Sequence, residues 1–300
     1  MKQAYLIMAH TNLNQLCRLV SALDYYNSDI YIHADKKWKD FDAEIIRKYC
    51  HQSNLYFVKR LDVVWGDYSQ IECEMNLFSA AINSNRYLYL HLLSGFDFPL
   101  CGPSKINDFF EVNYPAQFVY FDRNNSTELA LQRCKEYHLF QRYTGRRKNE
   151  PSLIKCLEDI SLGIQRRLKI NRNRKTIFNK YEKGANWVSI TGDFAEYLMH
   201  KQKEIKRAFH HTVCCDEVFL HTVLKNSPFI SDIYKSEIKD RDGYFYTNMV
   251  YTDWNRGRPY TFKSEDFEEL ISSPYIFARK FDENTDCDIL EKIENYIKKG

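Results

Sequence analysis

The 300-residue chain has few of the residues that interrupt regular structure, with only 10 glycines and 7 prolines. This scarcity excludes collagen-like and low-complexity chains and argues against disorder. No apolar run reaches the roughly 18 residues that a membrane-spanning helix requires. The 43 basic and 40 acidic residues leave a net charge of only +3, and no nucleic-acid-binding motif accompanies it. We therefore expect no nucleic-acid partner.

Several nucleotide-site and hydrolase motifs are also missing from the sequence. It contains no Gly-x-x-x-x-Gly-Lys loop, no Gly-x-Gly-x-x-Gly turn and no Gly-x-Ser-x-Gly elbow. P-loop proteins, dinucleotide-binding domains and α/β-hydrolases thus lack their fingerprints here. The first residues do not form a signal peptide, and the nine cysteines are odd in number. From this we expect reduced thiols and a cytoplasmic protein.

Strand and helix patterns alternate in the first hundred residues. Buried-strand patterns cover residues 5–9, 30–33, 55–58 and 87–93, and helical spacing covers residues 12–26, 41–49 and 68–81. This rhythm predicts an α/β fold, a mostly parallel central sheet flanked by helices, in one domain over residues 1–300. Ligands bind such sheets beyond the carboxyl ends of the strands. We therefore expect His10, Asp35, Trp65 and residues 94–99 to share one rim.

The second half of the chain shows a weaker pattern. Further strands are predicted at residues 118–121 and 187–191, and helices at residues 192–201, 216–224, 264–271 and 288–298. Between them, residues 141–183 form a basic helical insertion with an apolar stripe at helical spacing: Leu153, Ile154, Leu157, Ile160, Ile164 and Leu168. One interpretation is a solvated surface helix whose stripe faces the core. The other is a basic face on an anionic membrane surface or a lipid-linked acceptor.

Acidic residues do not form a metal site at the expected rim. Enzymes that act on sugar nucleotides often hold a divalent metal with Asp-x-Asp after a central strand, but here Asp97 stands alone between two phenylalanines. The pairs Asp40/Asp42, Asp240/Asp242 and Asp286/Asp288 lie at a helix start or in polar segments. The sequence His210-His211-x-x-Cys214-Cys215 lacks two separated ligand pairs for zinc. Without a metal, a diphosphate needs fixed cations, for which Arg279 and Lys280 lead, followed by Arg256 and Arg258.

Two acids have both a structural and a functional interpretation. Glu217 lies in the first turn of a predicted helix, where acids are favoured by the helix dipole, and where a carboxylate could also act as a general base. Asp35 ends a predicted strand, where it could cap a turn or accept hydrogen bonds from a ribose or a uracil.

Five sequence segments, in this order along the chain, show a family resemblance: residues 63–70, 93–100, 184–191, 216–227 and 277–281. With them the chain resembles the Core-2/I-branching β-1,6-N-acetylglucosaminyltransferase family, which also contains the peptide O-xylosyltransferases, from about Ala4 to Asp282. The resemblance implies a GT-A fold and inverting transfer without a metal or other cofactor. We expect a bacterial member that moves N-acetylglucosamine from a UDP-sugar to a saccharide, carried on a lipid, in surface polysaccharide synthesis. The alternatives are a xylosyl or other UDP-sugar donor, or a sugar- or nucleotide-binding module without turnover.

The resemblance also implies residue roles. Glu217 matches the catalytic base, Lys280 the lysine on the donor diphosphate, and Arg258 its partner arginine, with Arg256 and Arg279 as further candidates. Asp35 and Trp65 match positions that contact the nucleoside. We also assign the end of the first strand, Met8, Ala9 and His10, to the nucleoside site. We assign Asp97, Trp187 and Asp216 to the sugar and acceptor side.

Overall fold

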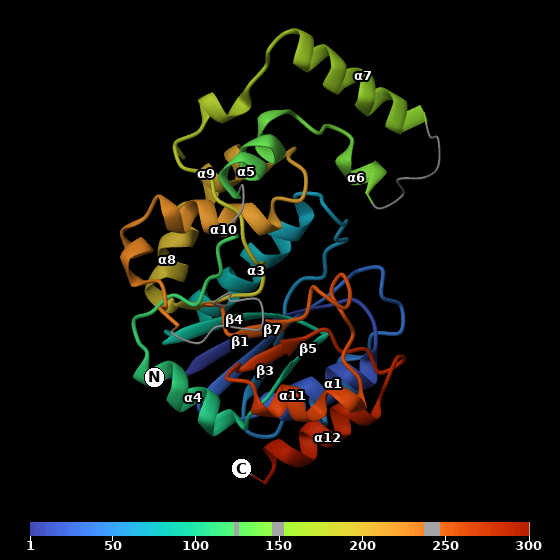
Figure 1. Cartoon of the computed structure of the whole chain (residues 1–300), viewed down its shortest axis with the longest axis vertical. Helices are drawn as coiled ribbons and strands as arrows, with labels where there is room; N and C mark the ends of the chain where they lie inside the picture. The colour runs from blue at the N-terminus through green and yellow to red at the C-terminus, as the bar shows by residue number, and fades with distance from the viewer. Residues whose placement is uncertain (123–125, 146–152, 237–246, 300) are drawn as a thin grey trace.

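A five-stranded sheet forms the centre of the computed structural model, which describes residues 1–122, 126–145, 153–236 and 247–299 (Figure 1). The strand order is β3-β2-β1-β4-β6. The first four strands are parallel and the last is antiparallel to β4. Their bounds are β1 (Gln3–Ala9), β2 (Ser28–Ala34), β3 (Asn54–Phe57), β4 (Tyr89–Ser94) and β6 (Ser189–Thr191). The predicted α/β fold with a mostly parallel sheet is thereby confirmed.

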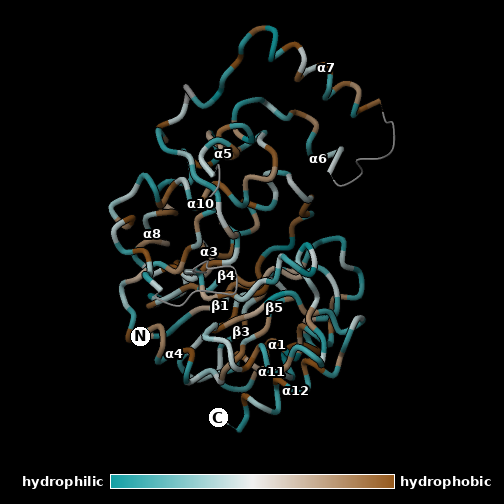
Figure 2. The backbone as a smooth tube through the Cα atoms, viewed as in Figure 1, coloured by the Kyte–Doolittle hydropathy of each residue, from teal (hydrophilic) through white to brown (hydrophobic). Residues whose placement is uncertain are grey.

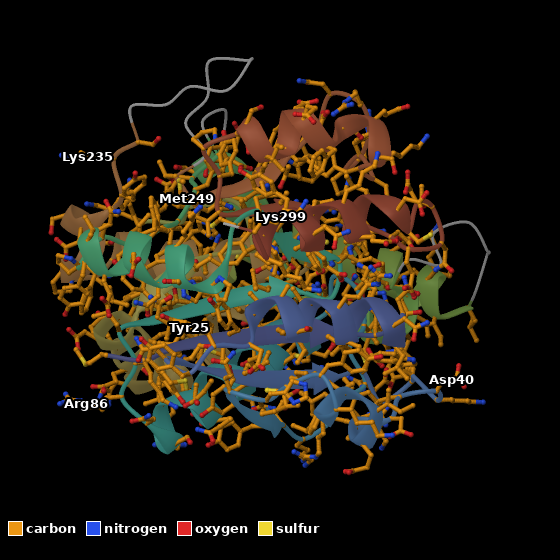
Figure 3. All side chains as sticks on the ribbon, turned by 90° about the horizontal axis from the view of Figure 1, so that it is seen from below. Tyr25, Asp40, Arg86, Lys235, Met249 and Lys299 are labelled. Atoms are coloured by element: carbon orange, nitrogen blue, oxygen red, sulfur yellow. The ribbon has the colours of Figure 1, made fainter. Side chains whose placement is uncertain are left out.

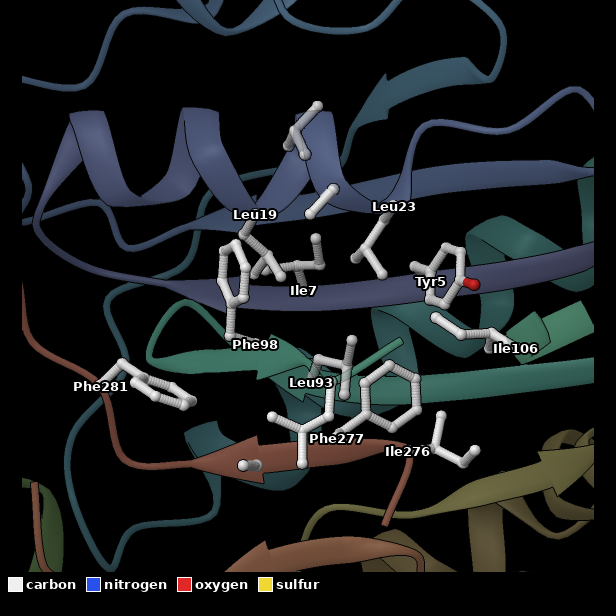
Figure 4. Packing of buried hydrophobic residues seen from close by; sticks show 14 of the residues in the cluster. Tyr5, Ile7, Leu19, Leu23, Leu93, Phe98, Ile106, Ile276, Phe277 and Phe281 are labelled. Carbon is white, nitrogen blue, oxygen red and sulfur yellow. The ribbon is translucent and has the colours of Figure 1, made fainter. Parts of the chain in front are cut away.

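Each face of this sheet has its own hydrophobic core. Successive side chains of a strand point to opposite faces, so Tyr5 and Ile7 join one core whereas Ala4 and Leu6 join the other. Figure 4 shows Tyr5 and Ile7 packed with Leu19 and Leu23 of α1 (Leu13–Leu23). Because both faces are covered, β1, β2 and β4 are buried along almost their whole length.

Helices cover the two faces as the sequence pattern predicts. Besides α1, and apart from those of the basic insertion, the helices are α2 (Ala43–Arg47), α3 (Ser69–Ser84), α4 (Pro103–Val112), α5 (Ser126–Lys135), α8 (Gly192–His200), α9 (Gln202–Phe209), α10 (Asp216–Lys225), α11 (Phe267–Ser272) and α12 (Asp288–Ile297). The 3₁₀ turns are η1 (Arg172–Lys175), η2 (Pro228–Asp232) and η3 (Ser264–Asp266). In Figure 1, α1, α11 and α12 lie on one side of the sheet, and α3, α8 and α10 lie on the other.

A second, three-stranded sheet was not predicted from the sequence. It has the order β5-β8-β7, with strands β5 (Asp97–Pro99), β8 (Phe277–Arg279) and β7 (Val250–Thr252). Strands of three residues are too short to give a recognisable alternating pattern. The register pairs Asp97 with Arg279. This pairing places the acid that follows β4 next to the two neighbouring cations Arg279 and Lys280. The strand predicted at residues 118–121 forms only isolated bridges, from Phe118 to Ser189 and from Phe121 to Gly184.

The basic insertion forms α6 (Gln141–Thr144), α7 (Leu153–Arg167) and η1 at the end of the molecule farthest from the C-terminus (Figure 1). Of the two interpretations of the apolar stripe on α7, the one in which the stripe faces the core is wrong. Leu153 is 78% exposed, Ile160 53% and Ile164 55%. The reason is that Glu158, Leu162 and Gln165 occupy the inner face instead, and two of these three residues are polar. Along the tube of Figure 2, brown apolar segments accordingly recur on this outermost helix.

Candidate active site

The carboxyl ends of β1 and β4 meet the end of β8 around one aromatic ring. The ring of Phe96 lies in the turn after β4, 5.3 Å from the ring of His10, which follows β1. The Lys280 Nζ lies 4.3 Å from the centroid of the same Phe96 ring. Met8 and Ala9 pack into the two cores, and Ala9 is buried. Of the predicted residues on this rim, His10 and Lys280 therefore offer side chains to a ligand, whereas Met8 and Ala9 shape the strand end.

Asp35 ties together the turns at the neighbouring strand end. Its Oδ1 accepts the Lys37 backbone N–H at 2.7 Å, and its Oδ2 accepts from the Val63 N–H at 3.3 Å and lies 3.1 Å from the Lys37 Nζ. These bonds fix the loop that leads to Trp65, whose side chain is 39% exposed. Arg142 of α6 lies between Asp62 and Asp67 of the same loop, at 3.6 Å and 3.7 Å. Asp35 is thus engaged in holding the loop that presents Trp65.

Arg279 is held between a buried acid and an indole ring. Its Nε lies 3.6 Å from the Oδ1 of Asp97, and its guanidinium lies 4.7 Å from the centroid of the Trp187 ring. Asp97 is fully buried, and its Oδ2 accepts the Ser94 backbone N–H at 2.8 Å. Burial raises the pKa of Asp97 to about 6, and the Arg279 charge opposes that rise. Because it is enclosed, Asp97 positions Arg279 and does not reach a sugar.

The two arginines of residues 253–259 differ in their surroundings. Arg256 pairs with Asp253, Asp266 and Glu269, and its guanidinium lies 4.2 Å from a tyrosine ring. Three carboxylates already compensate its charge, so the structure disfavours the predicted role of Arg256 on a diphosphate. Arg258 is exposed and is the better candidate of the two.

Glu217 begins α10 and is held from two sides by cations. Its Oε2 lies 2.7 Å from the Nη1 of Arg133 on α5 and 3.3 Å from the Nζ of Lys183. The side chain is 37% exposed, which leaves room for an incoming hydroxyl. The two cations fix the direction of the carboxylate, since charged hydrogen bonds are short and directional. The arrangement suits an acid that must accept a proton at its other oxygen.

Two further carboxyl groups lie beneath the start of α10. Asp216 accepts a hydrogen bond from Gln70 Nε2 at 2.9 Å, and burial together with the nearby Glu217 charge raises its pKa to about 6. Glu74 of α3 is fully buried, and burial and the Asp216 charge raise its pKa well above its usual range. The Oε1 of Glu74 accepts from Asn186 Nδ2 at 3.1 Å, whereas its Oε2 has no hydrogen-bond partner among the described residues.

We expect Glu74→Gln to stabilise the protein at alkaline pH. The folded state retains a proton on Glu74 that the unfolded chain releases as the pH rises above the usual glutamate range, so wild-type stability falls with rising pH and the glutamine variant does not share this loss. The gain in unfolding free energy should be about 1–3 kcal/mol near pH 8 and should vanish near pH 4. Urea melts at both pH values measure it.

The matched control is Glu72→Gln, two residues away on the same helix and exposed. It should change the unfolding free energy by no more than about 0.5 kcal/mol at either pH. If Glu74→Gln instead destabilised the protein near pH 8, the buried carboxyl would have to be ionised and favourably paired, contrary to its surroundings.

Residues 183–187 connect the acidic and cationic groups. Lys183 contacts Glu217, the Gly184 N–H donates to the backbone oxygen of Glu217 at 3.0 Å, Asn186 bonds Glu74, and Trp187 stacks on Arg279. Gly184 must be a glycine, because a Cβ there would lie 1.9 Å from the carbonyl oxygen of Tyr120. We call this stretch the bridging segment; it spans from the acid on α10 to the cation on β8.

Four residues of this arrangement were missed by sequence reasoning: Arg133, Lys183, Glu74 and Asn186. Arg133 and Lys183 are unremarkable among 43 basic residues, and only the fold brings them to Glu217. Glu74 carried a weak signal, because a helical repeat places it among the apolar residues of α3.

Two acids of the Asp-x-Asp pairs have structural roles. Asp42 caps α2, and Asp286 accepts backbone N–H groups at the start of α12. Asp40 is exposed and lies at the periphery in Figure 3. Asp240 and Asp242 fall outside the described residues. Across the part of the chain that the structure describes, no three His, Cys, Asp or Glu side chains come together as a metal-binding group.

The family model of the Core-2/I-Branching enzyme matches residues 3–271, so the chain belongs to the Core-2/I-Branching enzyme family. Its bounds enclose the central sheet, the bridging segment and α10, while β8 with Arg279 follows them. The predicted family is confirmed.

Xylosyltransferases are among the curated proteins that this chain resembles. Xylosyltransferase 2 of Rattus norvegicus is 23% identical over 98% of this chain, and Xylosyltransferase oxt of Drosophila melanogaster is 22% identical over 95%. The chain spans about a third of the length of these relatives, 33% and 32% respectively. A solved structure, mouse Xyloside xylosyltransferase 1 in its apo form, is similar with a TM-score of 0.39 and 9% identity over 92% of this chain and 97% of that one. That likeness is too weak to bear on the site.

Proposed function

We propose that this protein is an inverting, metal-independent glycosyltransferase that moves a sugar from a UDP-sugar to a saccharide hydroxyl. The observation that carries the proposal is the bridging segment, which joins a cation-held acid to a cluster of cations at the strand ends. Transfer needs both groups, because one removes a proton from the nucleophile while the other stabilises the departing diphosphate. Family membership supports the same reaction class.

Glu217 acts as the general base. Arg133 and Lys183 hold its Oε2, so Oε1 is left to accept the proton of the acceptor hydroxyl. As the O–H bond breaks, its oxygen attacks the anomeric carbon from the face opposite the diphosphate, and the bond from that carbon to the diphosphate oxygen breaks. The configuration at the anomeric carbon is therefore inverted.

Fixed cations stabilise the leaving UDP. The Lys280 Nζ lies over the Phe96 ring at the strand ends. Arg258 is exposed and lies a few residues after β7 in the sequence. Arg279, aligned by Asp97 and Trp187, adds positive charge behind Lys280. One acid, Asp97, follows β4, and it faces Arg279. This pairing supports a site in which side-chain cations, and not a metal held by two carboxylates, bind the diphosphate.

The nucleoside lies at the ends of β1 and β2. Trp65 offers a partly exposed indole for stacking on the base, and Asp35 fixes its loop. Trp187 and Asp216 lie on the acceptor side, next to the bridging segment and Glu217. The names of the curated relatives make UDP-xylose the first donor to test, with UDP-N-acetylglucosamine second.

The acceptor is a saccharide on a lipid carrier in bacterial surface polysaccharide synthesis, used at the inner face of the membrane. The basic insertion beside the Trp65 loop supports this location, since Arg142 contacts both Asp62 and Asp67 there. Within the described residues no helix is long and apolar enough to cross a membrane.

The experiment that tests the donor is a calorimetric binding panel with EDTA present. We expect UDP and one of UDP-xylose, UDP-N-acetylglucosamine, UDP-glucose, UDP-galactose or UDP-glucuronic acid to bind with a dissociation constant of roughly 1 µM–1 mM. Binding that needs added Mn²⁺ would contradict the roles of Lys280 and Arg258. Absence of binding to every UDP compound would contradict the proposed function.

A further inference from the structure

Helix α7 is attached to the protein by a face that carries two polar side chains and one leucine. Glu158, Leu162 and Gln165 are buried on this inner face. Glu158 accepts the Phe140 N–H at 3.0 Å and lies 3.1 Å from the Nδ1 of His138, while Gln165 exchanges two hydrogen bonds with the backbone of Tyr137, at 2.8 Å and 2.9 Å. These bonds fix the orientation of the helix. Its apolar side is thereby directed outward.

The outward side is a continuous apolar stripe. Its residues follow one another at intervals of three or four, so they lie on one helical face. We define the α7 stripe as Leu153, Leu157, Ile160, Ile164 and Leu168, whose exposure ranges from 43% to 78%. Three residues of the stripe, Leu157, Ile160 and Ile164, line one side of an open groove of about 510 Å³, and Tyr137, Leu139 and Phe140 line it as well.

Exposed apolar side chains gather at this end of the molecule. Of the 20 large hydrophobic residues that are exposed among those the structure describes, 11 lie between positions 129 and 177. Single exposed apolar residues are ordinary, but a contiguous patch marks an interaction surface. In Figure 1, α7 lies outermost along the long axis, so a flat surface could reach it without meeting the sheet.

The same region concentrates positive charge. Residues 141–183 contain 13 lysines and arginines against 4 acids, an excess of nine, whereas the whole chain carries +3. The remainder of the chain is therefore net acidic. Arg167 and Lys169 are exposed next to the stripe. An apolar stripe bordered by basic residues is complementary to an anionic lipid surface, where acyl chains lie beneath negative headgroups.

We propose that the α7 stripe rests on an anionic lipid bilayer, with its apolar side chains at the boundary between headgroups and acyl chains. A symmetric contact with a second copy would instead bring two strongly basic regions together, which like-charge repulsion opposes. The membrane contact extends the proposed function, and its significance for catalysis rests on that function. Residues 133–140 connect the two, because Arg133 contacts Glu217 and the backbone at 137–140 holds α7. A lipid-linked acceptor would thus be delivered on the side of the base.

The test is flotation of the full chain with vesicles of phosphatidylglycerol or of phosphatidylcholine. We expect the wild type to float with phosphatidylglycerol at low salt, to be released at high salt, and to bind phosphatidylcholine far less. The double variant Ile160→Glu, Ile164→Glu should lower the bound fraction about tenfold or more. The matched control, Tyr26→Glu with Val112→Glu, places two charges at residues that are 67% and 84% exposed elsewhere on the surface, and it should float like the wild type.

UDP binding, measured for all three proteins, shows whether the variants are folded and keeps this proposal separate from the proposed function. Wild-type protein that fails to float with phosphatidylglycerol at low salt would overturn the proposal. So would equal flotation of the stripe variant, or equal losses in the stripe variant and the control. Gel filtration adds a further outcome: a wild-type dimer that becomes a monomer in the stripe variant would assign the stripe to a second copy.

Discussion

Glu217→Gln lowers the rate of sugar transfer by about 10²–10⁴-fold, the usual contribution of a general base. Glutamine keeps the size of the side chain but cannot take the proton of the acceptor hydroxyl. UDP binding should change little, because the donor cations lie at the other end of the bridging segment. The measurement is the initial rate of UDP release with saturating donor and acceptor, beside UDP titration calorimetry.

The control for this prediction removes another ion-paired carboxylate near the same helix. Glu182 lies 3.1 Å from the Nζ of Lys225 at the end of α10, so Glu182→Gln loses an ion pair without touching Glu217. Its rate should stay within about threefold of the wild type, as for a weak surface pair. Thermal unfolding of both variants excludes loss of fold. A Glu217→Gln enzyme that keeps a tenth of its activity or more would remove Glu217 from the base role.

Lys280→Ala should lower kcat/KM by about 10²–10³-fold and weaken UDP binding by roughly tenfold or more. The expected loss is larger for turnover than for binding, because negative charge on the diphosphate grows as the bond to the sugar breaks. Lys280→Arg, which keeps the charge, should recover part of the rate. The measurement is the UDP dissociation constant together with steady-state rates over a range of donor concentrations.

Arg256→Ala is the matched control for the cationic site. Arg256 is already paired with Asp253, Asp266 and Glu269, so its removal should reduce stability and leave UDP affinity nearly unchanged. The opposite pattern, with UDP binding lost in Arg256→Ala and kept in Lys280→Ala, would exchange the roles of the two residues and contradict the site as described.

Much of the fold was predictable from local patterns. Four parallel strands and their connecting helices were located because long buried strands and amphipathic helices leave strong periodic signals. The second sheet was missed because its strands have three residues each and are stabilised by contacts distant in sequence, such as Asp97 with Arg279. Helix α7 was located, but its orientation was left open between two interpretations, because periodicity shows that a helix has two faces and not which one the protein buries.

Candidate site residues could be proposed only where their type, their position or a family-like segment marked them. Glu217, Lys280 and Arg279 were singled out as a helix-start acid and as fixed cations, and again because they stand in segments that resemble a family; their roles stay predictions. Arg133 and Lys183 could not be found, since they come from α5 and from the bridging segment and meet Glu217 only in three dimensions. The choice between Arg256 and Arg258 likewise needed the structure, which shows three carboxylates around the former.

The most direct test of the central claim is acceptor-dependent UDP release by the wild type and by Glu217→Gln, side by side in excess EDTA. The donor is the sugar nucleotide that binds best in the panel, and the acceptors are short saccharides. We predict that the wild type releases UDP under chelation and that the glutamine variant is slower by about 10²–10⁴-fold. Wild-type activity that disappears with EDTA and returns with Mn²⁺, or equal rates for the two proteins, would contradict the account.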